Sequence, residues 1–300
     1  MPWHVLGTGA MGSLMAARLA KVGCEVILLP RVSCTSNTPI TLSIQDKQAC
    51  WQQSLAWEDS GAHSPIKQLL VLTKAVDVSR AILNIAHRLS PQTEVVLLSN
   101  GMGFADELKS RLPYLNPVFG TTTDGAYRKD GWHIIHAGNG STHLGRAGQT
   151  VAPAWFEPWR KGLGNCQWTP TIDTLLWRKL AINCVINPLT AIHRCHNGQL
   201  IDRPALAMQV HLLCQELSGI YQSLGQHEAA RELEQQVLCV IRATANNRSS
   251  MLQDITAGRP TEIDYITGFV VAQAQAKNLA APLNEALLTK VKALHRLSPV

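Results

Sequence analysis

The chain has 300 residues, of which 46% are hydrophobic and 16% are charged, so it can bury a sizeable core in one large or two ordinary domains. The formal net charge is +6, but the lysines and arginines are scattered and only 5% of residues are aromatic, which argues against a nucleic-acid-binding stripe. No apolar run reaches the roughly 18–20 residues needed to span a bilayer, and the N-terminus has no basic signal-peptide region, so we expect no membrane partner.

The eight cysteines form no Cys-x-x-Cys pair. Together with the missing signal, this predicts reduced thiols in a cytoplasmic protein. His193-Arg-Cys195-His196 is the segment most like a metal cluster, but its spacing fits no closed zinc pattern and no second ligand pair follows. We therefore expect no metal. The mild positive charge is compatible with a polyanionic small molecule and equally with an ordinary solvated surface.

The N-terminal segment predicts a βαβ unit. Residues 3–6 form a short apolar run that leads into Gly7-Thr8-Gly9-Ala10-Met11-Gly12, residues 13–22 have helical periodicity, and residues 25–29 form a second strand. In this context G-x-G-x-x-G indicates dinucleotide binding. The first glycine permits the tight turn, the second lets the backbone approach a pyrophosphate, and the third lets helix and strand pack closely. The helix N-terminus supplies N–H groups and a positive dipole end.

The residue after the second strand predicts the choice of cofactor. NAD-binding proteins place an acidic residue there for the ribose 2′-hydroxyl, whereas an arginine accommodates a 2′-phosphate. Here the position holds Arg31, and no acid occurs between Glu25 and Asp46. Because a guanidinium binds phosphate and a carboxylate repels it, we predict NADP(H), although an ordinary surface arginine remains an alternative.

Polar residues follow the next two predicted strands. Lys74 comes after the strand at 69–72, and Asn100-Gly101 follows the strand at 94–98, with helices at 77–89 and 104–112. In an open parallel sheet, ligands bind beyond the carboxyl ends of the strands, so these residues are expected at a site together with the glycines. Residues 118–123 and 132–136 are predicted as further strands, and residues 120–126, including Ala126, are expected to touch the cofactor. Residues 32–64 are predicted to form weak strands and loops, and residues 146–170 have no firm period.

The segment from Leu175 to Pro188 is predicted to be a buried helix. Lys179, Asn183 and Asn187 are spaced i, i+4, i+8, which stacks their side chains on one face of an otherwise apolar helix. Such polar groups need partners, either a carboxylate and backbone groups elsewhere or a bound polar ligand, and three in register favour a ligand cleft. Pro188 predicts that the row ends at a helix terminus or a kink.

The rest of the chain is predicted to be almost entirely helical, with helices at 205–224, 229–245, 250–255 and 262–276 and a turn at Asn197-Gly198. Ser250 with Gln253, and Thr261 with Asp264, resemble capping boxes. The alternative is that Ser250 and Glu262 bind a ligand, and spacing alone leaves the two interpretations at even odds. The fold class is thus an N-terminal Rossmann doubly wound α/β sheet (1–168, NADP-binding) followed by an all-α domain (169–300, substrate and catalytic).

These motifs together resemble the ketopantoate reductase (2-dehydropantoate 2-reductase) family over nearly the whole chain. The most specific are Trp177-Arg-Lys-Leu-Ala-x-Asn-x-x-x-Asn-Pro, Ser250-Met-Leu-Gln-Asp and Glu262-Ile-Asp-Tyr-Ile. The resemblance implies NADPH-dependent reduction of the ketone of ketopantoate to pantoate, in pantothenate and coenzyme A biosynthesis, by a cytoplasmic monomer or homodimer with its active site in an interdomain cleft. Asp124 is an unexpected acid close to the expected cofactor edge.

The resemblance also implies the roles of the site residues. Lys179 is the general acid and Glu262 helps to fix the ternary complex, while Lys74 and Asn100 border cofactor and substrate. The substrate is held by Asn100, Asn183, Asn187, Asn197 and Ser250. The cofactor is bound by Gly7, Thr8, Gly9, Ala10, Met11, Gly12, Arg31, Lys74, Asn100, Ala126 and Glu262.

Two other functions remain open. The first is an NADPH-dependent reductase of another small 2-keto acid or an imine, which the Rossmann half cannot exclude because its motifs concern only the cofactor. The second is a catalytically silent NADP-sensing protein. An aligned lysine and asparagines are unnecessary in a sensor, so they count against it.

Overall fold

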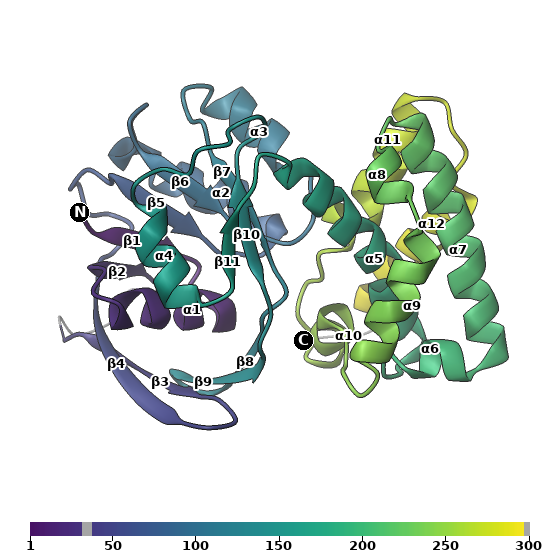
Figure 1. The fold of residues 1–300 in the computed structure, drawn as a ribbon, viewed down its shortest axis with the longest axis horizontal. Coiled ribbons are helices and arrows are strands. Elements are labelled where there is room, and N and C mark those ends of the chain that lie inside the picture. Colours follow the sequence, from purple (N-terminus) through teal and green to yellow (C-terminus); the bar gives the residue numbers. More distant parts are fainter. Residues whose placement is uncertain (32–37, 297–300) are drawn as a thin grey trace. The chain divides into compact units, whose positions relative to one another are not determined.

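The computed structural model describes residues 1–31 and 38–296, with side chains to residue 294. Contacts divide the chain into two compact units (Figure 1). The first comprises the described parts of 1–99 together with 104–172. The second comprises Asn100–Gly103 together with the chain from Asp173 onward.

The first unit contains a parallel sheet in the Rossmann order. From one side to the other its strands run β4-β2-β1-β5-β6-β7, all parallel. Trp3 of β1 is paired with Val26 of β2 on one side and with Gln68 of β5 on the other. These strands are β1 (Trp3–Leu6), β2 (Val26–Leu29), β4 (Cys50–Trp57), β5 (Gln68–Val71), β6 (Glu94–Leu97) and β7 (Val118–Thr122).

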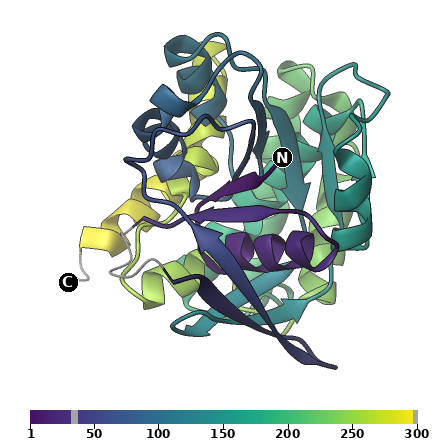
Figure 2. The same ribbon diagram turned by 90° about the vertical axis from the view of Figure 1, so that its left-hand side faces the viewer.

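The sheet continues beyond this parallel part at both edges. Beyond β4 lie β3 (Ile40–Gln45), β9 (His133–Gly138) and β8 (Gly125–Asp130), and beyond β7 lie β10 (Thr142–Gly145) and β11 (Cys166–Trp168). Helix α1 (Ala10–Lys21) contacts β1 and β2 and also β3, β4, β8 and β9, so the sheet curls around it (Figures 1 and 2). The curl brings β8 and β9 to the helix that follows the glycine-rich loop.

The helices of this unit cover both faces of the sheet. From β1 the chain moves to β2, whereas from β5 it moves in the opposite direction to β6. Because parallel crossovers are right-handed, α1 and α2 (Ala75–Asn84) lie on opposite faces. Helix α4 (Phe156–Leu163) packs on α1, and α3 (Phe104–Arg111) packs on α2, which leads into the short 3-10 helix η1 (Ala86–Arg88). The predicted doubly wound fold is confirmed.

The second unit is helical throughout its regular structure, as predicted. Its longest helix, α5 (Ile172–His193), supplies a large part of the core, including Leu180, Cys184 and Val185, each at most 2% exposed. The other helices are α6 (Gln199–Asp202), α7 (Pro204–Ser223), α8 (His227–Ala230), α9 (Leu233–Ala243), α10 (Ser250–Thr256), η2 (Ile263–Tyr265), α11 (Thr267–Ala276) and α12 (Pro282–Arg296).

The stretch predicted to hold weak strands does contain strands, and the stretch without a firm period contains a helix. Within 38–64, β3 and β4 form an antiparallel hairpin in which Ile40, Leu42 and Ile44 alternate inward; residues 32–37 lie outside the described residues. Within 146–170, α4 buries Phe156, Trp159 and Leu163 on one face.

The helix that carries Lys179 does not end at Pro188. Helix α5 continues to His193 with Pro188 inside it, so of the two predicted outcomes the helix terminus is wrong and the kink stays a prediction. Proline removes one backbone hydrogen bond and disfavours helical geometry in the preceding residue. Burial compensates for this cost here, because Leu189 and Ala191, which follow within one turn, are fully buried.

Two predicted helices are interrupted. The segment 229–245 breaks into α8 and α9 around Glu232, which has a left-handed φ of 53°. The segment 262–276 begins with the 3-10 helix η2, and α11 starts only at Thr267. Across residues 1–31 and 38–296, no helix is both long and apolar enough to cross a membrane.

Candidate functional site

The loop between β1 and α1 uses its three glycines in three different ways. Gly7 has a φ of +99°, a conformation that favours glycine. A Cβ atom on Gly12 would lie 1.9 Å from the Gly7 carbonyl oxygen, so the helix start packs directly on the loop. A Cβ atom on Gly9 would meet no heavy atom within 4 Å. The loop is therefore open at Gly9, and these environments suit a turn, a phosphate approach and close packing.

The open side of this loop lies at the start of α1. Gly9 is the N-cap residue, and Thr8, Ala10 and Met11 are partly exposed around it. The first N–H groups of a helix have no intrahelical acceptor and carry the positive end of the helix dipole. This part of the first unit can therefore hold the pyrophosphate of a dinucleotide.

An arginine that contacts this loop was not predicted. The Arg128 guanidinium, on β8, donates to the carbonyl oxygen of Thr8 and lies 4.8 Å from the ring centroid of Trp132. No local sequence signal places Arg128 there, because the contact depends on the curl of the sheet around α1 (Figures 1 and 2). The contact adds positive charge beside the loop.

Arg31 lies just beyond β2, as expected. Its side chain is 80% exposed, and its Nη1 atom is 3.8 Å from Oδ2 of Asp77, in the first turn of α2. No acid was expected beside Arg31, because Asp77 is far from it along the chain and only the fold brings the two together. A distance of 3.8 Å to a mostly exposed arginine is a weak, exchangeable ion pair.

Lys74 occupies the carboxyl end of β5 as the N-cap residue of α2. Next to it, the Ser99 hydroxyl donates to the Thr73 carbonyl oxygen at 2.8 Å, which ties the ends of β5 and β6 together. Ala126 lies on β8, partly buried and paired with His136 of β9. The predicted cofactor roles of Lys74 and Ala126 stay predictions.

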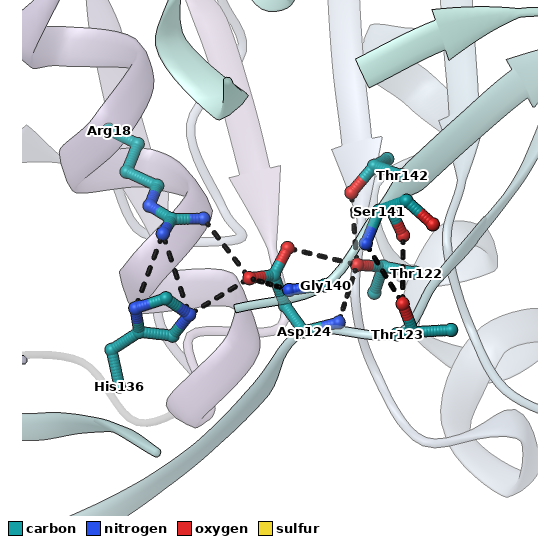
Figure 3. Close-up of polar contacts among 8 residues, drawn as sticks. All are labelled: Arg18, Thr122, Thr123, Asp124, His136, Gly140, Ser141 and Thr142. Atoms are coloured by element: carbon teal, nitrogen blue, oxygen red, sulfur yellow. Dashed lines mark hydrogen bonds and ion pairs between the residues drawn. The ribbon is translucent and has the colours of Figure 1, made fainter. Parts of the chain in front are cut away.

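The unexpected acid, Asp124, is neutralised inside the first unit (Figure 3). Its side chain is only 4% exposed, and its Oδ1 atom lies 2.8 Å from Nε2 of His136 and 3.4 Å from Nη1 of Arg18. The Gly140 N–H also donates to this carboxylate. Asp124 therefore joins α1 to β9 and does not present a bare negative charge to a bound phosphate.

In the second unit, α5 carries the predicted row of polar side chains. Lys179 and Asn183 are partly exposed, and Asn187 is 7% exposed. On an α-helix the row extends about 12 Å and turns slowly around the axis. The neighbouring residues Leu180, Ala181 and Cys184 are buried in the core.

Lys179 has the most perturbed amine of the site. Although the residue as a whole is partly exposed, desolvation of its ammonium group lowers the pKa to about 8, and the negative charge of Glu262 acts in the opposite direction. Glu262 is 8% exposed, and its Oε2 atom accepts a hydrogen bond from the side-chain amide of Asn100 at 3.4 Å. Glu262 thus links two of the predicted site residues within the second unit.

The segment Asn100–Gly103 packs tightly within the second unit. The Met102 N–H donates to the Tyr265 carbonyl oxygen at 2.8 Å. Gly101 has a φ of +81°, and a Cβ atom there would lie 2.6 Å from that same oxygen; one on Gly103 would lie 3.0 Å from the ring of Phe269. The Asn-Gly pair is therefore more than turn chemistry, because it seats Asn100 beside Glu262.

The start of α10 is held against α5, and its cap is not the predicted residue. Ser249 caps the helix: its Oγ accepts from the Leu252 N–H at 3.1 Å. Its hydroxyl is also hydrogen-bonded to that of Thr190, on α5, at 2.6 Å. Ser250 is the first helical residue and is exposed, so the capping interpretation of Ser250 is wrong.

Asn197 is fixed to the segment that leads into α10. Its side-chain amide donates to Thr244 Oγ1 at 2.9 Å, and its backbone N–H donates to the Asn247 carbonyl oxygen. Its side-chain oxygen is buried, without a protein partner among the described residues. The second unit therefore gathers Asn197 and Ser250 at one connected segment beside α5. Thr261 does not begin a continuous α-helix, since α11 starts at Thr267.

Within the described part of the chain, no group of three or more histidine, cysteine, aspartate or glutamate side chains is arranged as a metal site. The second unit instead carries an amine, a carboxylate, amides and hydroxyls, and the first unit has a glycine loop with an arginine bound to it. An amine of lowered pKa among amides can bind and protonate an oxygen.

Comparison with known proteins identifies the family. The model described as "Ketopantoate reductase PanE/ApbA" matches residues 3–149, and its C-terminal counterpart matches residues 171–295. A 2-dehydropantoate 2-reductase of Shigella flexneri is 41% identical over 293 residues, covering 96% of this chain and 93% of its own length.

Solved structures of other proteins share this fold over nearly their full length. A PanE/ApbA family ketopantoate reductase from Ralstonia eutropha has a TM-score of 0.87 at 21% identity, and D-mandelate dehydrogenase with NADH and anilino(oxo)acetate has a TM-score of 0.89 at 22% identity. Each alignment covers 99% of both chains. At these identities the likeness concerns the fold alone.

A Rossmann unit with an open glycine loop, joined in one chain to a helical unit with an aligned lysine, defines a dinucleotide-dependent oxidoreductase. The matches over both halves then give the family: this chain belongs to the ketopantoate reductases. The predicted family and enzyme class are confirmed, while the individual residue roles stay predictions.

The two serines at the start of α10 give a matched test. We expect Ser249→Ala to lower the free energy of unfolding by about 1 kcal/mol, because it removes the helix cap, and Ser250→Ala to leave it nearly unchanged. Ser250→Ala should instead raise KM for the substrate. Thermal unfolding and steady-state kinetics on both variants test this; equal loss of stability in both would contradict the assignment of the cap.

Proposed function

We propose that this protein reduces 2-dehydropantoate (ketopantoate) to (R)-pantoate with NADPH, with Lys179 as the proton donor. The observation that carries the proposal is the desolvated amine of Lys179, with its pKa near 8, on the same helix as Asn183 and Asn187 and opposed by Glu262. Membership of the ketopantoate reductase family supports the substrate, and pantoate formation belongs to pantothenate and coenzyme A biosynthesis.

The first unit fits the proposed cofactor. The loop is open at Gly9, α1 points its N-terminus at the loop, and Arg31 is exposed beyond β2 where a 2′-phosphate is expected. In the proposed assignment Thr8, Ala10 and Met11 contact the pyrophosphate through the backbone, while Lys74 and Ala126 border the cofactor. NADPH supplies the hydride for the reaction when it is bound.

The second unit supplies the proton and holds the substrate. Reduction of a ketone places negative charge on its oxygen, and the Lys179 ammonium stabilises that charge and then donates a proton from Nζ. Glu262 keeps a larger fraction of Lys179 protonated, since its charge raises the pKa. The Asn100 side-chain amide donates to Glu262, and in the proposed assignment Asn100 contacts both cofactor and substrate.

The remaining polar groups are proposed to hold the substrate's hydroxyl and carboxylate. Amides and a hydroxyl are suited to this role because they bind without adding charge next to Lys179. Asn197 offers a buried side-chain oxygen, and Ser250 an exposed hydroxyl at the first turn of α10. The substrate-binding set is Asn100, Asn183, Asn187, Asn197 and Ser250.

Reduction of another 2-keto acid is the second candidate. The fold of D-mandelate dehydrogenase is close to that of this chain, but at 22% identity it carries no inference about substrate. The relative at 41% identity favours ketopantoate. A cytoplasmic location and a monomer or homodimer remain our proposals for the enzyme in the cell.

The proposal is tested by following NADPH oxidation with ketopantoate, pyruvate and 2-ketoisovalerate, each repeated with NADH. We expect fast turnover only with ketopantoate and NADPH. The substrate-binding asparagines are expected to select ketopantoate, and Arg31 is expected to select the cofactor that carries the 2′-phosphate. Turnover with NADH but not NADPH would contradict the cofactor assignment. NADPH binding without turnover of any keto acid would favour a sensor.

The pKa of Lys179 predicts the pH dependence of reduction. The protonated amine is the active form, so kcat/KM should be level below about pH 8 and fall tenfold per pH unit above it. In Glu262→Gln the negative charge that raises this pKa is removed, so the falling limb should move to lower pH. A limb that stays in place or moves to higher pH would refute the coupling of these two residues.

A further inference from the structure

The surface around Arg31 contains a second arginine that the proposed function does not use. Asp77, on α2, contacts two guanidinium groups: its Oδ2 atom lies 3.8 Å from Arg31 Nη1, and its Oδ1 atom accepts a hydrogen bond from Arg80 Nη2. The two arginines come from different elements, because Arg31 follows β2 and Arg80 lies one turn beyond Asp77 on α2.

The exposures of the three side chains differ in an informative way. Arg31 is 80% exposed and Arg80 is 63% exposed, whereas Asp77 is 26% exposed. The Asp77 side chain is thus the most buried of the three, and both arginine side chains are largely exposed to solvent. An isolated Asp–Arg pair at i, i+3 is common on helices, but that does not account for the third member, Arg31.

The charge of this cluster suits a phosphate. Two arginines and one carboxylate leave one net positive charge, and a phosphate monoester carries about −1.5 to −2 at neutral pH. Each guanidinium has five N–H donors, so Arg80 can keep Asp77 as a partner and still donate to a second anion. Both guanidinium groups contact the one Asp77 carboxylate, and a phosphate accepts hydrogen bonds on several oxygens, so we expect one phosphate to bind both.

We propose that Arg80 is a second specificity-determining residue for the cofactor. Together with Arg31 it binds the 2′-phosphate, and Asp77 is the counter-ion that orients the Arg80 guanidinium. This inference rests on the proposed use of NADPH. Arg31 exchanges its weak pair with Asp77 for the phosphate, whereas Arg80 keeps Asp77 and directs its remaining donors to the same group. Asp77 thus positions a guanidinium and is not the ribose-binding acid of an NAD site.

The test measures binding of two cofactor fragments by isothermal titration calorimetry, without turnover. Adenosine 2′,5′-bisphosphate carries the 2′-phosphate, and 5′-AMP lacks it. We expect Arg80→Ala to weaken binding of the bisphosphate by about tenfold and to leave 5′-AMP within twofold. Arg31→Ala should behave in the same way.

Arg160→Ala is the matched control. Arg160 is 57% exposed and pairs at i, i+3 with Glu157 on α4, which carries none of the proposed cofactor residues. The Arg160→Ala variant removes the same kind of helical ion pair from α4. It should therefore leave the affinities for adenosine 2′,5′-bisphosphate and 5′-AMP unchanged. Thermal unfolding of all three variants checks that they fold.

The outcomes separate the two proposals. If Arg31→Ala weakens the bisphosphate but Arg80→Ala does not, the role of Arg80 is refuted and the use of NADPH stands. If Arg80→Ala weakens both fragments equally, its effect does not concern the 2′-phosphate and the inference fails. If the unmodified protein binds both fragments equally, the NADPH assignment itself is refuted, and Arg80 falls with it.

Discussion

The chemistry proposed for this protein depends on the balance of forces on one ammonium group. Lys179 lies on a helix whose other side chains, such as Leu180 and Cys184, form the core, and desolvation there disfavours its charged form. Glu262 opposes the desolvation and favours the charge. The result is a pKa of about 8, so that the amine is protonated at neutral pH and still releases its proton readily.

In the first unit too, residues from distant parts of the chain contribute to the proposed binding groups. The glycine loop and α1 are local in sequence, but the arginines near them come from β8 and from the end of β2. Asp124 would disturb an anion site if its charge were exposed. It is instead paired with Arg18 and His136, so the chain places an acid near this edge without presenting its charge to a ligand.

The features predicted correctly from sequence are those encoded by short-range patterns. The βαβ unit follows from an apolar run, glycine spacing and helical periodicity, and the row on α5 follows from i, i+4 spacing. The hydrogen bond from Met102 to Tyr265 and the contact of Arg128 with Thr8 join segments far apart in sequence, so no local pattern shows them. A helix terminus at Pro188 was one of two predicted outcomes, and it is wrong because α5 continues to His193 through buried residues.

The most direct test of the account is the effect of Lys179→Ala on turnover of ketopantoate and on the Kd for NADPH, with Lys161→Ala, an exposed lysine on α4, as control. We predict that turnover falls by about 10²- to 10⁴-fold, because the general acid is lost. The Kd for NADPH should stay nearly unchanged. Unchanged turnover with intact NADPH binding would contradict the proposed role of Lys179.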